Sequence, residues 1–132
     1  MAREADGGGR GRGHIPTRRA LVVESSPGAC AVVQVALDLE AWAVTAAAGT
    51  AAARHALASA GPFHLVACDA ASLDALREAA RLMPAARRVC YAARDAVPAD
   101  DLRELGAELL HAPATARTLR QFLARPRRGP MR

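Results

Sequence analysis

The sequence predicts a three-layer α/β sandwich, in which a five-stranded parallel sheet is covered by helices on both faces. The first observation behind this expectation is that short apolar runs alternate five times with longer segments whose apolar residues recur at helical spacing. Such alternation favours right-handed crossovers and therefore parallel strands. The second observation is the length of 132 residues, which suffices for one domain and is too short for two.

Five apolar segments are predicted to be strands, and they are 20–24, 43–47, 63–69, 88–92 and 108–111. The first and third are almost wholly apolar until they end at Glu24 and Asp69, as expected for strands buried on both faces. The second is the weakest prediction, because it is rich in alanine, which is a poor strand former.

A segment with helical spacing follows each strand, and these segments are 28–40, 50–60, 72–82, 98–105 and 115–123. Ser25 and Ser26 precede the first helix and offer hydroxyls that can cap it. Thr50 and Ser72 stand at the starts of the second and third helices and are expected to cap them in the same way.

Positive charge is concentrated at the two ends of the chain. All 18 basic residues are arginine, and residues 1–19 carry +3 while residues 125–132 carry +4, which leaves −2 for residues 20–124 out of the formal net charge of +5. The Gly-rich segment 1–17 is predicted to be a disordered basic tail, 125–132 a second basic tail, and 18–124 the folded domain. A mildly acidic domain does not have the charge of a DNA-binding fold, although its tails could contact phosphates.

The three cysteines, Cys30, Cys68 and Cys90, lie in apolar segments and have no metal-site spacing. They are expected to be buried, reduced thiols of a cytoplasmic protein. No apolar run approaches the length of a membrane span, and the start of the chain has no hydrophobic signal segment. No Ser-His-Asp order, nucleophile elbow or phosphate-binding loop is present, so no enzyme active site is predicted.

The strands 20–24 and 63–69 are thus each expected to end in a carboxylate, Glu24 and Asp69, at the edge where open parallel sheets form their binding sites. With segments 21–27 (LVVESSP) and 65–69 (LVACD), the chain resembles a response-regulator receiver domain of the CheY-like kind. The resemblance implies a flavodoxin/CheY-like strand order of 2-1-3-4-5 and a phosphoryl acceptor at Asp69. It also implies a weak Mg²⁺ site formed by Glu24, Asp69 and the backbone carbonyl of Ala71.

Four positions depart from the receiver pattern. Ser25 stands where the pattern has a second metal-binding acid, and Ala92 where it has a Thr or Ser hydroxyl. Ala112, before Pro113, stands where it has a lysine, and Leu109 where it has the switch aromatic. Without these groups, the negative charge that develops on a transferred phosphoryl group has little to stabilise it.

The sequence therefore favours a degenerate receiver, or pseudo-receiver, that acts as a phosphorylation-independent protein-interaction module in bacterial signalling or regulation. The expected partner is a protein, such as a histidine kinase, another signalling protein or a second copy of the chain. By analogy with receivers, the expected surface spans 100–123, and Arg103, Glu104, Arg117 and Arg120 are its polar groups.

Two alternatives stay open. In the first, the chain is an atypical receiver that a histidine kinase phosphorylates on Asp69. In the second, it is a nucleic-acid-associated protein that works through its arginine-rich tails. None of the three hypotheses requires a membrane, and the only cofactor that any of them includes is the weak Mg²⁺ site.

Overall fold

The computed structural model describes residues 17–125, so most of the two predicted tails, residues 1–16 and 126–132, lie outside the described part of the chain. The strands are β1 (Arg19–Glu24), β2 (Ala43–Ala48), β3 (Leu65–Asp69), β4 (Arg87–Ala92) and β5 (Ala107–His111). The helices are α1 (Ala31–Leu39), α2 (Gly49–Ser59), α3 (Leu73–Leu82), α4 (Ala99–Glu104) and α5 (Ala116–Ala124), and a 3₁₀ turn, η1 (Ala70–Ser72), joins β3 to α3.

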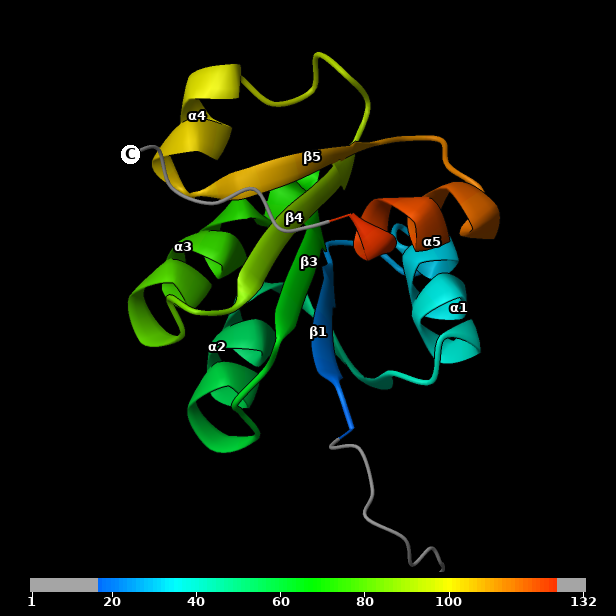
Figure 1. Ribbon diagram of the computed structural model, residues 1–132. Helices are drawn as coiled ribbons and strands as arrows, with labels where there is room; N and C mark the ends of the chain where they lie inside the picture. Colours follow the sequence, from blue (N-terminus) through cyan, green and yellow to red (C-terminus); the bar gives the residue numbers. More distant parts are fainter. Residues whose placement is uncertain (1–16, 126–132) are drawn as a thin grey trace, which may run out of the picture.

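The five strands form one parallel sheet in the order β2-β1-β3-β4-β5, which confirms the predicted three-layer α/β class and its strand order. Figure 1 shows α2 and α3 on one face of the sheet and α1 and α5 on the other, with α4 beside β5. Within residues 17–125, no helix is long and apolar enough to cross a bilayer.

The sheet separates two apolar cores, because successive side chains of a strand point to opposite faces. Val66 and Cys68 of β3 pack in the core under α2, α3 and α4, whereas Leu65 and Ala67 of the same strand pack in the core under α1 and α5. The three cysteines are buried and free, as predicted. Burial on both faces explains why β1 and β3 are apolar up to their last residue.

The predicted start of the first helix is wrong by three residues. Gly28 has a φ of +85°, a left-handed conformation that favours glycine, and α1 starts three residues later, at Ala31 after Cys30. Neither Ser25 nor Ser26 caps α1, since its N-cap is Cys30 and no side chain caps it from that position. The serines are therefore available for other contacts.

Most other predicted boundaries differ from the observed ones by one or two residues. The third strand begins at Leu65 and not at residue 63, although Phe63 is buried in the core. Thr50 does not cap α2, which begins at Gly49, and Ser72 occupies the N-cap of α3 without making a side-chain capping bond. Arg125, predicted to begin the second tail, is described and stacks its guanidinium 4.8 Å from the centroid of the Phe122 ring.

Arg87, the first residue of β4, joins three elements on the α5 side of the sheet. Its Nε donates to Oε1 of Glu108 on β5 at 2.6 Å, and both side chains are largely buried. Its other nitrogens donate to the carbonyl oxygens of Phe122, Leu123 and Arg125 at 3.3–3.5 Å. Because a helix leaves its last carbonyls without intrahelical partners, Arg87 satisfies the end of α5 and fixes it to the sheet.

Candidate functional site

The two predicted carboxylates meet at the carboxyl edge of the sheet. β1 and β3 are neighbours, with Val23 paired to Cys68, so Glu24 and Asp69 follow side by side where the two strands end. Both are partly exposed. The structure thus places the two acids together at the edge where open α/β sheets build their sites.

Asp69 is held by the loop that follows β1. The backbone N–H of Ser25 donates to its Oδ2 at 3.1 Å and to its Oδ1 at 3.3 Å, and the Ser25 hydroxyl makes a very short hydrogen bond to Oδ2. The hydroxyl of Ser72 also lies near enough to this carboxylate to lower its pKa. Partial burial raises the pKa of Asp69, but the hydrogen bonds from Ser25 and the hydroxyl of Ser72 outweigh burial, so the pKa lies below its ordinary value.

Glu24 is engaged in a different local contact. Its Oε2 accepts a hydrogen bond from the backbone N–H of Cys30 at 2.6 Å. Cys30 is the N-cap of α1, so the carboxylate satisfies an amide at a helix start, where negative charge is also favoured by the helix dipole. The capping task that the sequence suggested for the serines is therefore performed by Glu24.

The two carboxylates are arranged poorly for Mg²⁺. This ion requires nearly octahedral oxygen ligands and is commonly held by carboxylates together with water and phosphate. Here both oxygens of Asp69 accept hydrogen bonds from Ser25, and Glu24 accepts a hydrogen bond from the backbone N–H of Cys30, while Ala71 lies in the exposed η1 turn. Among residues 17–125 no group of three or more His, Cys, Asp or Glu side chains is placed to hold a metal. In this arrangement the residues do not fit a magnesium site.

The positions that depart from the receiver pattern also lie at this edge. The backbone N–H of Ala112 donates to the carbonyl of Ala92 at 2.8 Å, so the positions expected to carry a lysine and a hydroxyl are direct neighbours. Ala92 is 6% exposed and belongs to the core. Leu109 packs against the same core on the α4 side of β5. Ala92 and Ala112 thus present methyl groups at the two positions where the receiver pattern has a hydroxyl and a lysine.

Two residues of this edge were missed by the sequence analysis. Ser72 is 1% exposed and is the only buried polar residue among residues 17–125; its hydroxyl lowers the pKa of Asp69 and makes no capping bond to α3. The hydroxyl oxygen of Tyr91 accepts the N–H of Ala114 at 3.1 Å and so fixes the loop between β5 and α5. The available signals were a serine three residues after the acid and the single tyrosine of the chain.

Cys30 and Cys68, the two buried thiols near the acids, both have raised pKa values. Burial and the nearby carboxylates of Asp69 and Glu24 raise the pKa of Cys30 to about 12. A hydrogen bond with Cys90, together with burial, raises the pKa of Cys68. A thiol that stays protonated is a poor nucleophile, so these cysteines serve as core side chains.

The four polar residues predicted for a partner surface do not share one face. Arg103 pairs with Asp100 within α4, whereas Nε of Arg120 lies 3.0 Å from Oε2 of Glu40 at the end of α1. Arg120 therefore faces α1 and lies away from β5 and α4. Glu104 and Arg117 are exposed, and neither forms an ion pair with another described residue.

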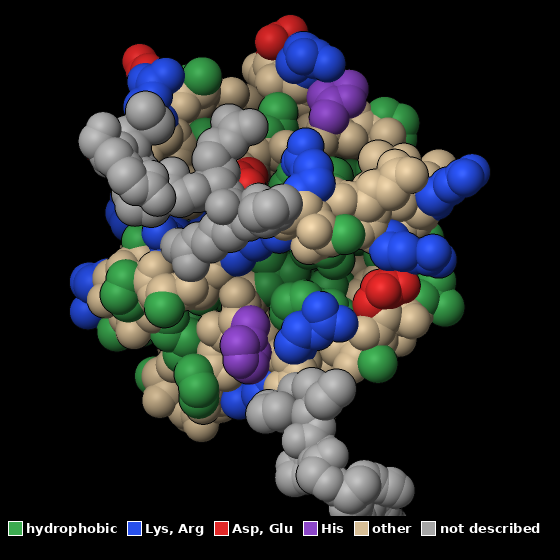
Figure 2. Space-filling model, viewed as in Figure 1, with side chains coloured by type: hydrophobic (Ala, Val, Ile, Leu, Met, Phe, Trp, Pro, Cys, Tyr) green, Lys and Arg blue, Asp and Glu red, His purple; other side chains and the backbone are tan. Residues whose placement is uncertain are grey.

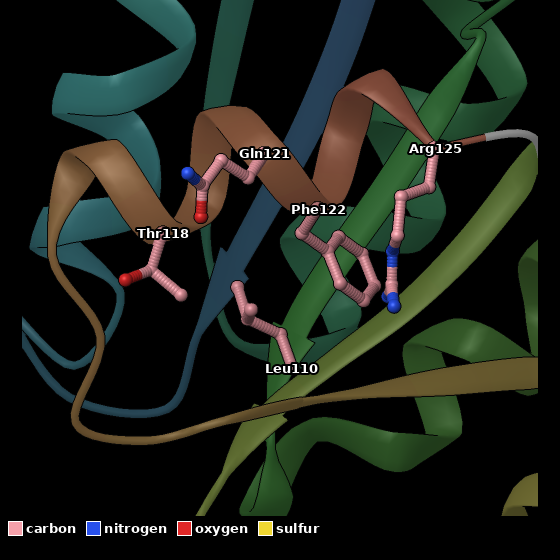
Figure 3. Close-up of a pocket in the computed structure, with 5 residues that line it drawn as sticks. All are labelled: Leu110, Thr118, Gln121, Phe122 and Arg125. Carbon is pink, nitrogen blue, oxygen red and sulfur yellow. The ribbon is translucent and has the colours of Figure 1, made fainter.

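A shallow depression of about 250 Å³ lies between β5 and α5 (Figure 3). Its lining consists of Leu110, Thr118, Gln121, Phe122 and Arg125. Leu110 and Phe122 are buried and give it an apolar floor, while the three polar residues are exposed. On α5, the side that faces β5 is thus formed by Thr118 and Gln121, which the sequence analysis did not single out.

No protein-family model matches the sequence, and no curated protein is similar to it. Solved structures do match. A CheY-like response regulator receiver domain protein from Methanospirillum hungatei JF-1 has a TM-score of 0.70 at 17% identity and covers 82% of this chain and 91% of its own. A response regulator from Thermotoga maritima has a TM-score of 0.69 at 22% identity, with coverages of 82% and 95%. A response regulator receiver protein from Pseudomonas putida has a TM-score of 0.69 at 19% identity and covers 83% of this chain and 98% of its own.

These similarities show that residues 17–125 have the fold of a CheY-like receiver domain. At such low identity they establish the fold alone, so the chemistry of this chain has to be argued from its own site residues.

Proposed function

We propose that this protein is a pseudo-receiver, a receiver-like domain that acts as a phosphorylation-independent protein-interaction module in bacterial signalling or regulation. The observation that carries the proposal is the contact between Ser25 and Asp69. A serine stands at the position of a metal-binding acid, and its amide and hydroxyl occupy the carboxylate that would accept the phosphoryl group.

The charge balance of the site supports the proposal. A phosphoryl group arriving at Asp69 would bring more negative charge next to Glu24, and Ala112 supplies no countercharge. Ala92 supplies no hydroxyl that could draw the loop after β4 toward a phosphoryl group. We infer that the carboxyl edge of the sheet does not change conformation and that the domain acts by binding a partner protein, without enzymatic activity and without a bound cofactor.

The proposed output surface is the edge made by α4, β5 and α5. Its exposed groups include Glu104 and Arg117, and the depression between β5 and α5 offers an apolar floor for a partner side chain. Arg103 belongs to this surface through its pairing with Asp100 on α4, and Arg120 forms its margin next to α1. The proposed partner is a signalling protein of the cytoplasm, or a second copy of the chain.

The experiment is incubation of the full chain with a small-molecule phosphodonor and Mg²⁺, followed by intact mass measurement. We expect no added phosphoryl mass, because the Asp69 oxygens are engaged and the site lacks a cation. A phosphoryl adduct that disappears in Asp69→Ala would refute the proposal. A receiver domain known to accept phosphate from the same donor serves as the positive control.

One observation favours a second candidate, an atypical receiver phosphorylated on Asp69. The lowered pKa keeps this carboxylate ionised at neutral pH, and the side chain is partly exposed, so it has the charge state and access of a nucleophile. In this candidate Ser25 would have to release Asp69, and Mg²⁺ would be held by Glu24, Asp69 and the carbonyl of Ala71. The mass experiment separates the two candidates directly.

A further inference from the structure

Two large apolar side chains of α1 are exposed. Val35 is 52% exposed and Leu39 is 66% exposed, and within residues 17–125 the only other exposed large hydrophobic residue is Leu82 on α3. Val35 and Leu39 are four positions apart, so they lie one turn apart on the outer side of the helix, away from the side that packs on the sheet. The outer side of α1 is therefore apolar, although no element of the described chain covers it.

The neighbouring helix α5 differs from α1 in charge. The two helices lie side by side on the same face of the sheet (Figure 1). α1 with its C-cap contains the acids Asp38 and Glu40 and no base, whereas α5 contains Arg117 and Arg120 and no acid. Figure 2, seen from the same side as Figure 1, shows arginine, acidic and hydrophobic side chains next to one another where α1 and α5 lie. The outer surface of this helix pair is thus acidic on one helix and basic on the other.

The level of the two helices relative to each other is defined by one ion pair. Both helices follow strands of one parallel sheet, so they run in the same direction, and the contact of 3.0 Å between Nε of Arg120 and Oε2 of Glu40 puts these two residues at one level. Asp38 precedes Glu40 by about 3 Å along its helix axis, and Arg117 precedes Arg120 by about 4.5 Å. Asp38 and Arg117 are exposed, and neither forms an ion pair with another residue of 17–125. An acid on α1 and an arginine on α5 therefore lie at nearly the same level.

Such a surface is complementary to a rotated copy of itself. A two-fold axis that runs between the helices and parallel to them places α1 of one copy against α5 of a second copy without changing the level of either. Asp38 of each copy then meets Arg117 of the other, and Val35 and Leu39 of both copies are covered. Opposite charges across an interface select the partner and the register, and burial of the apolar side chains stabilises the contact.

We propose that the outer face of α1 and α5, defined by Val35, Asp38, Leu39 and Arg117, is a two-fold interface between two copies of this chain. A second copy fits this face because it supplies an arginine for Asp38 and an acid for Arg117 at the same time. A uniformly acidic or uniformly basic partner would match only one of the two helices. The dimer goes beyond the pseudo-receiver function, because it does not depend on Asp69 and leaves α4 and β5 accessible to another partner.

The test measures the dimer dissociation constant of the full chain by sedimentation velocity across a concentration series. Leu39→Gln removes an apolar contact of the proposed interface, and Val35→Gln, one turn earlier, is a second variant of the same kind. Leu82→Gln is the matched control, because it removes an exposed leucine from α3 on the opposite face of the sheet. All three side chains are exposed, so the folded state should persist, and circular dichroism checks this.

We expect Leu39→Gln to weaken the dimer by about tenfold or more, because a two-fold interface contains each contact twice, while Leu82→Gln stays within a factor of about two of the original chain. Asp38→Arg and Arg117→Asp each oppose like charges and should each weaken the dimer by about tenfold. The double variant Asp38→Arg, Arg117→Asp opposes unlike charges again, so its dissociation constant should return to within about threefold of the original value.

Three results would overturn the proposal. One is an original chain that stays monomeric at every concentration. Another is an equal loss in Leu39→Gln and Leu82→Gln, which would indicate association through any exposed apolar side chain. The last is a double charge-reversal variant that dimerises as weakly as the single variants or more weakly, which would show that Asp38 and Arg117 do not face each other across the interface.

Discussion

Ser25 donates both its backbone N–H and its hydroxyl to the carboxylate of Asp69, and so joins the loop after β1 to the end of β3. The two residues are 44 positions apart in the sequence. The contact places two hydrogen-bond donors on the carboxylate at the carboxyl edge of the sheet. It lowers the pKa of Asp69 and determines what else this carboxylate can bind.

Ser25→Ala removes the hydroxyl donor but keeps the backbone N–H. We expect the pKa of Asp69 to rise toward its ordinary value and the free energy of unfolding at pH 7 to fall by about 1 kcal/mol, which is less than a fully buried bond to a charged group contributes, because Asp69 is partly exposed. An NMR pH titration of the carboxyl resonance gives the pKa, and urea unfolding gives the stability.

The loss of stability in Ser25→Ala is expected to depend on pH in a defined direction. A carboxyl whose pKa is lower in the folded than in the unfolded state stabilises the fold fully above the unfolded pKa, about 3.9, and this stabilisation is lost as the pH falls through the folded pKa. The difference between the original chain and Ser25→Ala should therefore shrink below about pH 4. Ser26→Ala, at the exposed neighbouring serine, is the control, and an equal effect there would contradict the assignment.

Glu24 is expected to stabilise α1 through the amide of Cys30. Glu24→Ala removes the acceptor and should cost about 1 kcal/mol, as for the loss of a helix cap. Glu24→Gln keeps an oxygen acceptor and loses only the charge, so it should retain more than half of that stability. Chemical denaturation of both variants at neutral pH distinguishes them, and equal losses would show that the hydrogen bond to Cys30 contributes nothing.

Much of the fold was predictable because β1 and β3 are buried on both faces and so are apolar to their last residue. The position of Glu24 beside Asp69 was also predictable, since neighbouring parallel strands end at one edge of the sheet. The role of Ser25 was not predictable, because a serine before a helix most often caps it, and only the adjacency of β1 and β3 brings Asp69 within reach.

The start of α1 is a second feature that could not be predicted from the sequence. Apolar spacing extends upstream from α1 and gives no sign that Gly28 has a positive φ or that the helix starts only at Ala31. The role of Arg87 was likewise invisible in sequence, because its partners Glu108 and Phe122 come from two later elements that only the folded sheet brings together. Side-chain contacts between distant elements are decided by tertiary packing, which local patterns do not contain.

Arg87→Met should be the most destabilising single change considered, by about 3 kcal/mol, because it breaks a largely buried ion pair and removes three bonds to the end of α5. Arg87→Lys keeps the charge but cannot reach Glu108 and the helix carbonyls at once, so an intermediate loss is expected. Hydrogen exchange should accelerate in α5 before it does in α2. Uniform acceleration in both helices would indicate that Arg87 does not act on α5 in particular.

Adding the missing acid, hydroxyl and ammonium tests whether their absence is what keeps Asp69 from accepting a phosphoryl group. The triple variant Ser25→Asp, Ala92→Thr, Ala112→Lys replaces the hydroxyl donor on Asp69 with a second acid, keeps the backbone N–H of residue 25, and supplies the absent hydroxyl and ammonium. Because Ala92 and Ala112 are joined through their backbone at 2.8 Å, both new side chains would start from the edge that holds Asp69. We expect this variant to gain phosphoryl mass from a small phosphodonor in a Mg²⁺-dependent manner, since it regains a metal-binding pair and a countercharge. The same triple variant with Asp69→Asn should gain none. If the triple variant folds, as judged by circular dichroism, and stays unmodified, then the absence of these three groups is not what keeps Asp69 unreactive.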